Sequence, residues 1–122
     1  MNDKKIKVNQ EADIEKCSIV YITGYKNSRD YFPKLVKKLD NYKVKRILTN
    51  WSVALDFCLF SSGKIEAIVH VNSELYDHVA GRLIAEEAGA KITDFKGKKE
   101  FEGRKFLVSN GTGIHEKLLK VV

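Results

Sequence analysis

Long hydrophobic runs are absent from this chain of 122 residues, and cysteine is scarce in it. No apolar stretch approaches the roughly 20 residues that a membrane helix needs. The polar start, MNDKKIKVNQ, lacks the apolar stretch of a signal peptide, so we expect a cytoplasmic protein without a membrane anchor. The two cysteines, Cys17 and Cys58, match no metal or redox spacing and lie among apolar residues. We therefore expect reduced, buried thiols.

Several chemical signatures are also missing. There is no glycine-rich phosphate loop, and no Ser-His-Asp or Cys-His pairing at a recognisable spacing. The three histidines, His70, His78 and His115, have no partner pattern, which favours ordinary surface or core positions over ligand roles. We find no internal repeat, low-complexity tract or linker. With 43% hydrophobic residues the chain can bury a core, and residues 1–122 are expected to form a single domain.

The net charge of +6 raises the question of a nucleic-acid partner. The lysines are scattered in short groups, such as Lys37-Lys38 and Lys98-Lys99, and acids are mixed among them in the second half. No aromatic residues alternate with a basic stripe to form a stacking platform. The composition therefore favours a solvated, lysine-rich surface, and a nucleic-acid-binding module is the least favoured of the functions considered.

The hydrophobic pattern predicts alternating strands and helices. Residues 1–16 are expected to hold a short edge strand at 6–8 and then a loop. Strands are predicted at residues 17–23, 44–48, 65–71, 91–95 and 105–109. Helices are predicted at residues 30–39, 52–62, 77–88 and 114–121. This order predicts an α/β fold with a mostly parallel central sheet of about five strands and helices on both faces.

The helix predicted at 77–88 raises a specific question about its first residue. Asp77 stands where a helix N-cap would, and its charge suits the helix dipole. The apolar spacing places four residues on the buried stripe: Ala80, Leu83, Ile84 and Ala88. Glycines at 63 and 89 are expected to end the helices that precede them.

Five short motifs then occur in order over most of the chain. They are WSVALD at 51–56, SSGKIEA at 61–67, YDHVAG at 76–81, EAGA at 87–90 followed by Thr93-Asp94, and Ser109-Asn110 with HEKLL at 115–119. Together they resemble the carboxy-terminal half of the inositol monophosphatase family, the lithium-sensitive, magnesium-dependent sugar and inositol phosphatases. Residues 2–9, NDKKIKVN, resemble a turn near the start of that half. The resemblance implies the same α/β domain.

The resemblance also assigns candidate site residues. Asp77 corresponds to the family's carboxylate ligand of a second Mg²⁺ ion, and four residues correspond to its substrate side: Trp51, Ser52, Val53 and His70. Two of them depart from the family pattern. Trp51 replaces a glycine and would fill space beside the substrate, and His70 replaces a glutamate that often contacts a substrate hydroxyl. These departures weaken an assignment of inositol phosphate as the substrate.

The family motifs that bind most of the magnesium are not in this sequence. Asp-Pro-x-Asp-Gly-Thr does not occur, and the neighbours of the single proline, Pro33, do not match. The Glu-Glu pair in this sequence, Glu86-Glu87, overlaps the carboxy-terminal EAGA motif and is not the family's amino-terminal pair. One carboxylate does not make a magnesium site. We therefore expect the chain alone to lack catalytic residues and phosphatase activity, and to act as a homodimer or with a complementary amino-terminal half. The alternative is a non-catalytic binding or oligomerisation domain derived from the family.

Overall fold

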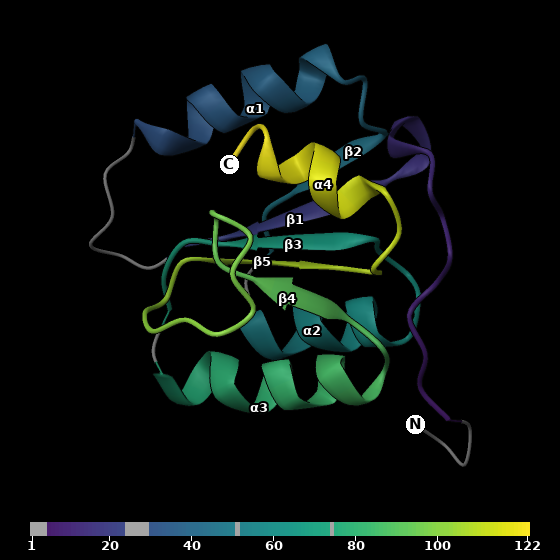
Figure 1. The fold of residues 1–122 in the computed structure, drawn as a ribbon, viewed down its shortest axis with the longest axis vertical. Helices are drawn as coiled ribbons and strands as arrows, with labels where there is room; N and C mark the ends of the chain where they lie inside the picture. Colours follow the sequence, from purple (N-terminus) through teal and green to yellow (C-terminus); the bar gives the residue numbers. More distant parts are fainter. Residues whose placement is uncertain (1–4, 24–29, 51, 74) are drawn as a thin grey trace.

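The computed structural model describes residues 5–23, 30–50, 52–73 and 75–122, with the backbone alone for 75–77. Its centre is a sheet of five strands (Figure 1). They are β1 (Ser18–Ile22), β2 (Arg46–Leu48), β3 (Ala67–His70), β4 (Lys91–Thr93) and β5 (Phe106–Ser109). The strand order is β2-β1-β3-β5-β4, and β5 runs antiparallel to both its neighbours while the other four share one direction.

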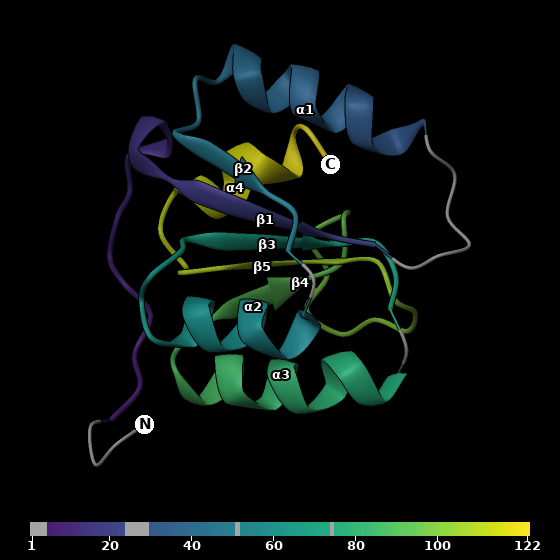
Figure 2. The same ribbon diagram turned by 180° about the vertical axis from the view of Figure 1, so that it is seen from behind.

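Helices cover both faces of this sheet, as Figures 1 and 2 show. The upper layer consists of α1 (Tyr31–Asn41) and α4 (Ile114–Leu119), and the lower layer of α2 (Val53–Ser61) and α3 (Leu75–Glu87). The predicted α/β architecture, with its mostly parallel sheet of about five strands, is confirmed.

Each layer closes its own apolar core against the sheet, because alternate strand residues point to opposite faces. Val69 and Leu107 point to the upper core, where they join Leu35, Leu39 and Leu118. The lower core contains the strand residues that point to the opposite face, together with residues of α2 and α3. Its members include Val20, Ile68, Phe57, Phe60, Ala85, Phe106 and Val108. The continuous apolar strands predicted from sequence are therefore buried on both sides.

The ends of the lower-layer helices follow the sequence chemistry. Ser52 caps α2 by accepting a hydrogen bond from the Leu55 N–H at 3.2 Å. Gly63 and Gly89 follow α2 and α3 with φ of 81° and 98°, a left-handed region that favours glycine. Their predicted role in ending the helices is confirmed.

The predicted edge strand at residues 6–8 does not form, because residues 5–13 contain no strand. Val8 donates a single backbone hydrogen bond to the Ala88 carbonyl at the end of α3, at 3.0 Å, and packs into the lower core. The alternation of apolar residues and lysines did not distinguish a paired strand from an extended segment without a partner strand. We call this extended segment, residues 5–13, the strap. The predicted loop at 9–16 also contains a 3-10 helix, Ile14–Lys16.

A polar network holds this strap across the amino-terminal edge of the sheet. Asn110 donates to the Asn9 side chain at 2.8 Å and to the Glu11 carbonyl at 2.9 Å. Asn9 in turn donates to the Glu66 carboxylate at 2.8 Å, and that carboxylate also accepts from the Ser18 N–H at 2.7 Å. The first residues described are therefore tied to β1 and to the end of β5.

Two expectations for α3 are wrong. The helix begins at Leu75, so Asp77 is its third residue and lies in the first turn, not at the N-cap. The buried stripe consists of His78, Gly81, Ala85 and Ala88, whereas Leu83 and Ile84 face solvent. Small residues occupy the buried face because α3 lies close to α2. A Cβ at Gly81 would lie 2.5 Å from ring carbons of Phe57.

Candidate functional site

The sheet topology defines one edge where a ligand site is expected. The chain passes from β1 to β2 through α1 on the upper face, and from β2 back to β3 through α2 on the lower face. The carboxyl ends of β1 and β3, at Ile22 and His70, are paired neighbours, and the next helices along the chain, α1 and α3, lie on opposite faces of the sheet. In open α/β sheets such a switch point forms the crevice that binds ligands.

Most sequence-predicted site residues lie at this edge. Ser52 and Val53 begin α2, Asp77 is in the first turn of α3, and His70 ends β3 (Figure 2). Both lower-layer helices therefore start at the carboxyl edge of the parallel strands, where their amino ends favour negative charge. Trp51 and the side chain of Asp77 lie outside the described residues. The roles of all five residues stay predictions.

His70 is fully buried, and both of its ring nitrogens are hydrogen-bonded. Nδ1 lies 2.6 Å from the Arg104 carbonyl, which can only accept, so Nδ1 carries the proton. Nε2 then accepts from the Ser73 hydroxyl at 2.7 Å, and Ser73 Oγ also lies 3.1 Å from Nδ1 of His78. The neutral His70 ring is thus held within the fold, stacked on Phe106 at 4.2 Å between centroids.

The electrostatics around this histidine oppose a further positive charge. Burial lowers the pKa of His70 to about 4. The hydrogen bond to the Arg104 carbonyl opposes this shift, and interactions with His78, Arg82 and Arg104 lower the pKa by smaller amounts. The Arg82 guanidinium lies 4.9 Å from the ring centroids of both Phe101 and Phe106. The end of β3 is therefore a neutral-to-cationic environment at physiological pH.

A shallow depression opens beside the same end of β3. It is lined by Val71, Asn72, Glu102, Gly103, Arg104 and Lys105. The segment between β4 and β5 thus contributes cationic groups to the edge that holds His70. The sequence motifs did not single out this segment, because its residues match no family pattern that we identified.

Sequence reasoning also missed a buried carboxyl group in α2. Asp56 is fully buried, and its Oδ1 accepts a hydrogen bond from the Asn50 side chain at 2.7 Å. Its Oδ2 is buried and has no hydrogen-bond partner among the described residues. Burial therefore raises the pKa of Asp56, against the opposing effect of the Asn50 hydrogen bond. The bond ties the segment after β2 to the first turn of α2, next to Ser52 and Val53.

The two cysteines and His115 have structural surroundings. Cys17 is buried and Cys58 half-buried, and both are free thiols. Burial raises the pKa of Cys17 to about 12, which makes it unreactive. His115 Nε2 lies 2.8 Å from Thr93 Oγ1 and Nδ1 lies 2.6 Å from Ser109 Oγ, both buried. Because Thr93 already donates its proton to the Asp94 carbonyl, Nε2 of His115 is the donor and Nδ1 the acceptor.

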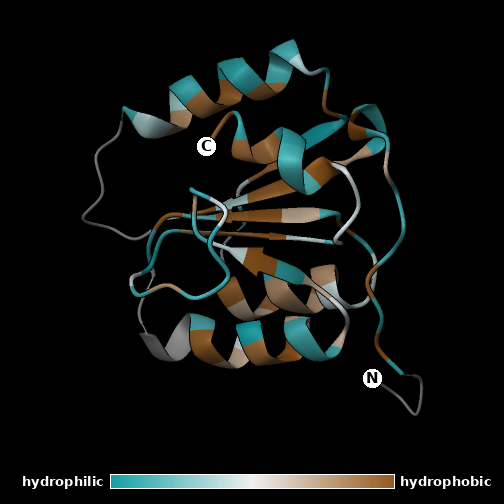
Figure 3. Ribbon diagram, viewed as in Figure 1, coloured by the Kyte–Doolittle hydropathy of each residue, from teal (hydrophilic) through white to brown (hydrophobic). Residues whose placement is uncertain are grey.

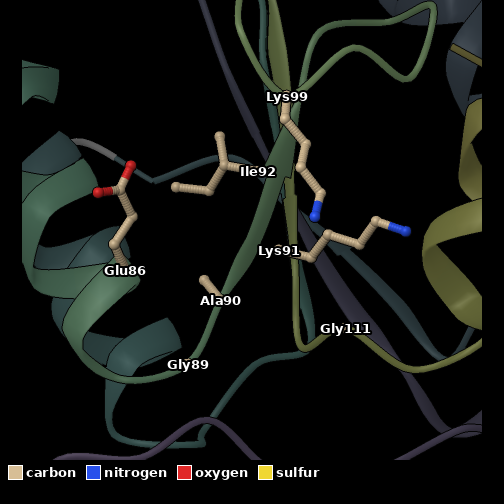
Figure 4. A pocket seen from close by; sticks show the side chains of 7 residues that line it. All are labelled: Glu86, Gly89, Ala90, Lys91, Ile92, Lys99 and Gly111. Carbon is tan, nitrogen blue, oxygen red and sulfur yellow. The ribbon is translucent and has the colours of Figure 1, made fainter.

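A second depression lies near the opposite edge, between the end of α3 and the start of β4 (Figure 4). Its lining residues are Glu86, Gly89, Ala90, Lys91, Ile92, Lys99 and Gly111. Glu86 stands on one side and Lys91 and Lys99 on the other, so no single sign of charge dominates. None of the sequence-predicted site residues reaches it.

Carboxylate ligands for magnesium do not gather in the described part of the chain. No group of three or more His, Cys, Asp or Glu side chains there is placed to hold a metal ion. The side chains at the end of β3 are imidazole, hydroxyl and guanidinium groups, whereas Mg²⁺ prefers several oxygen ligands including carboxylates. The described residues therefore do not fit a magnesium ion by themselves. Within the same ranges, no helix is long and apolar enough to cross a membrane.

The fold defines a class: an α/β domain with a mixed five-stranded sheet, helices on both faces, and a switch point at the carboxyl ends of β1 and β3. Comparison with known proteins makes the class specific. The model of the inositol monophosphatase family matches residues 1–122, and the chain belongs to this family.

Individual relatives support the family and show how much of it the chain spans. A fructose-1,6-bisphosphatase/inositol-1-monophosphatase of Thermotoga maritima is 32% identical over 122 residues, covering 99% of this chain and 45% of the relative. A putative Nus factor SuhB of Neisseria meningitidis serogroup B is 24% identical, covering all of this chain and 47% of that protein. The chain therefore spans about half the length of the curated relatives that it matches.

Solved structures agree with the fold. An inositol monophosphatase from Thermotoga maritima superposes with a TM-score of 0.84 at 29% identity, covering 98% of this chain and 45% of that chain. The SuhB protein of Bartonella henselae gives a TM-score of 0.85 at 22% identity, which shows the shared fold alone. The predicted family resemblance is confirmed.

Proposed function

We propose that this chain is the carboxy-terminal domain of a magnesium-dependent phosphomonoesterase, and that it needs a complementary half to complete the catalytic site. The observation that carries the proposal is the meeting of Ser52, Val53, His70 and the first turn of α3 at one switch-point edge in an inositol monophosphatase-family domain. In this role Asp77 is a ligand of one magnesium ion, and Trp51, Ser52, Val53 and His70 line the substrate side.

Magnesium, when bound, would polarise phosphoryl oxygens and activate the attacking water. This chain contributes the amino ends of α2 and α3, whose partial positive charge favours an anionic substrate. Because His70 is held neutral and is neighboured by Arg82 and Arg104, the substrate side favours electron-rich or anionic groups. The remaining metal ligands have to come from a complementary half of the enzyme, on the same or on another polypeptide.

The lower helical layer offers a surface for that half. Four large apolar side chains on α2 and α3 are exposed: Leu55 by 51%, Val79 by 42%, Leu83 by 60% and Ile84 by 38%. Grouped apolar side chains on a soluble domain mark contact surfaces. We call these four residues the α2–α3 apolar face, and we propose that the complementary half covers it. When that half is missing, a second copy takes its place and gives a homodimer.

Activity tests the catalytic part of the proposal. The isolated chain with magnesium and a generic phosphomonoester should release phosphate at the background rate. Mixed with the separately produced amino-terminal half of the Thermotoga maritima relative, it should show magnesium-dependent turnover that Asp77→Asn abolishes. Asp40→Asn, at an exposed carboxylate on α1, is the matched control and should leave turnover unchanged. Turnover by the isolated chain that needs Asp77 would contradict the requirement for a second half.

Light scattering at micromolar concentration tests the covering of the α2–α3 apolar face. The isolated chain should have the mass of a dimer, and Leu55→Gln with Leu83→Gln should make it monomeric. The control pair Lys37→Gln with Asp40→Asn changes two exposed residues of α1 and keeps the net charge, so it should leave the mass unchanged. A wild-type chain that stays monomeric on concentration would sink this part of the proposal.

The second candidate is a non-catalytic binding or oligomerisation domain. It is favoured by the state of His70, whose ring nitrogens are both hydrogen-bonded inside the fold and so are not available to a substrate hydroxyl. The activity experiment separates the two functions. A tight complex of the two halves without any turnover would favour this candidate over the phosphatase.

A further inference from the structure

The positive charge of this chain is concentrated in one short segment. Residues 34–46 contain one acid, Asp40, and six bases: Lys34, Lys37, Lys38, Lys43, Lys45 and Arg46. That segment therefore carries a net charge of +5, out of +6 for the whole chain. The remaining residues sum to +1, because the acidic stretch 47–90, at −4, offsets a second basic region at 91–122, at +4. The charge is therefore unevenly distributed, and residues 34–46 carry it at the highest density.

The fold places these bases on one side of the molecule. Lys34, Lys37 and Lys38 are exposed on α1 at a spacing that puts them on one helix face. Lys43 and Lys45 lie in the turn after α1, and Arg46 is the first residue of β2, an outer strand of the sheet. All six are exposed, and Figure 2 shows how α1 passes through the turn into β2. We call these six residues the α1–β2 basic edge.

Ion pairs do not neutralise this edge within the described ranges. The salt bridge found among the described residues lies elsewhere: it joins Lys91 of β4 to Glu116 of α4, at 3.0 Å. A cluster of exposed, unpaired cations produces a positive potential that attracts polyanions from solution. Lys43, Lys45 and Arg46 also stand at the amino end of β2, away from the carboxyl edge that holds His70. This part of the edge is therefore distinct from the candidate phosphatase site, whereas Lys34 lies at the start of α1, on the carboxyl side of the sheet.

Lys43 supplies an independent observation, because its backbone φ is 59°. Left-handed conformations cost a non-glycine residue roughly 1–2 kcal/mol, and glycine is the usual choice at this point after a helix. The turn is fixed by the Lys43 N–H, which donates to the Asp40 carbonyl at 2.9 Å. A long cation thus occupies the position where glycine would be least strained. The turn thus adds a sixth exposed cation to the edge at a position where most helices carry none.

We propose that the α1–β2 basic edge binds the phosphodiester backbone of a nucleic-acid duplex without reading its sequence. A duplex carries one negative charge per ~1.7 Å of its axis, and an 11-residue helix such as α1 is ~16 Å long, so several phosphates face the edge at once. Tyr42, the aromatic residue within the segment, is half-buried and packs against the upper core. Backbone contacts therefore provide the affinity.

Fluorescence anisotropy with a labelled, blunt duplex DNA of random sequence tests this proposal. Binding should be measurable at about 50 mM salt and should weaken steeply toward about 200 mM. The triple variant Lys37→Gln, Lys38→Gln, Lys45→Gln should lose at least about tenfold in affinity and should flatten the salt slope by roughly 0.9 per lost phosphate contact. Circular dichroism should show an unchanged fold, because all three side chains are exposed.

The matched control removes the same charge elsewhere. Lys96→Gln, Lys98→Gln, Lys99→Gln changes three exposed lysines after β4 and should cost less than about threefold in affinity. Equal losses in the two triple variants would mean that net charge alone drives binding, and would overturn the proposal. So would the absence of duplex binding at low salt, or tighter binding to phosphatidylserine vesicles or polyglutamate than to the duplex.

Discussion

The two helical layers have similar inner faces and opposite outer faces. Both pack apolar side chains against the sheet. On the outside, α1 presents lysines, whereas α2 and α3 present Leu55, Val79, Leu83 and Ile84, a contrast visible for α1 and α3 in Figure 3. A helix that is apolar on more than its inner face is built to be covered. The outer faces therefore indicate that α1 is exposed to solvent, whereas α2 and α3 form a contact surface.

Both layers also have buried histidines on their inner side, and the comparison extends to one from each: His70 of β3 below and His115 of α4 above. His70 packs with the lower core on Phe106, and His115 follows Ile114 of the upper core on α4. Both rings are neutral, and burial is the first cause that lowers the pKa of each to about 4. Interactions with His78, Arg82 and Arg104 lower the pKa of His70 further, and Lys91 does so for His115, whereas the Arg104 carbonyl and Glu116 act in the opposite direction.

Acidification should produce the largest loss of stability. Both histidines have a folded pKa of about 4, below the ordinary value near 6.5, so the unfolded chain binds protons first as the pH falls. Their contribution is complete above about pH 6.5 and is lost as the pH falls toward about 4, by up to about 3 kcal/mol for each histidine. Urea unfolding followed across this window measures the loss.

Replacing one histidine at a time shows how much of this loss of stability comes from each layer. His70→Gln and His115→Gln should each remove about half of the pH dependence, while lowering stability at neutral pH by about 1–3 kcal/mol because buried partners lose a hydrogen bond. A free energy of unfolding that stays level from neutral pH to about pH 4 would show that neither histidine resists protonation.

A smaller effect is expected from adding a methyl group between the lower-layer helices. A Cβ at Gly81 would lie 2.5 Å from ring carbons of Phe57 and 3.0 Å from its Cβ. Gly81→Ala should therefore destabilise the protein by about 1–3 kcal/mol, in spite of the better helix propensity of alanine. The upper-layer control is Gly113→Ala, because a Cβ there meets no atom within 4 Å. Equal melting temperatures for the two variants would contradict this difference in packing.

The smallest effect concerns the strained turn after α1. Lys43→Gly relieves the left-handed backbone and should stabilise the fold by up to about 1 kcal/mol, less the entropy that glycine adds to the unfolded chain. The same variant should weaken duplex binding, so stability and affinity move in opposite directions. A loss of stability in thermal unfolding would show that the lysine side chain supports the turn.

Periodicity predicted the elements of this fold but not the choice between two possible faces of α3. The large residues Leu83 and Ile84 were expected inside, yet Gly81 and Ala85 occupy the interface because they let α3 approach α2. Hydropathy ranks side chains by size and polarity, whereas the distance between neighbouring elements decides which stripe fits. Hydropathy also failed to predict the conformation around Val8: the residue is apolar and buried, but its extended segment pairs with no strand in the described part of the chain.

The candidate site was predicted residue by residue only where a family motif covered it. Ser52, Val53, His70 and Asp77 were predicted in this way, and the fold brings their backbone positions to one edge. Asp56 ends the motif at 51–56, but its burial was not predicted, and neither was the contribution of Arg104, because burial and strand order are tertiary properties. The basic edge was missed for the same reason: lysines that look scattered in the sequence lie on adjoining elements.

The two outermost strands of the sheet, β2 and β4, have three residues each, and each begins with a cation, Arg46 or Lys91. Short, charged borders are poor templates for adding strands from another chain. Crowded copies of this domain should therefore meet through their helices and not through their sheets. Concentrated solutions are then expected to cloud reversibly and to stay free of fibrils.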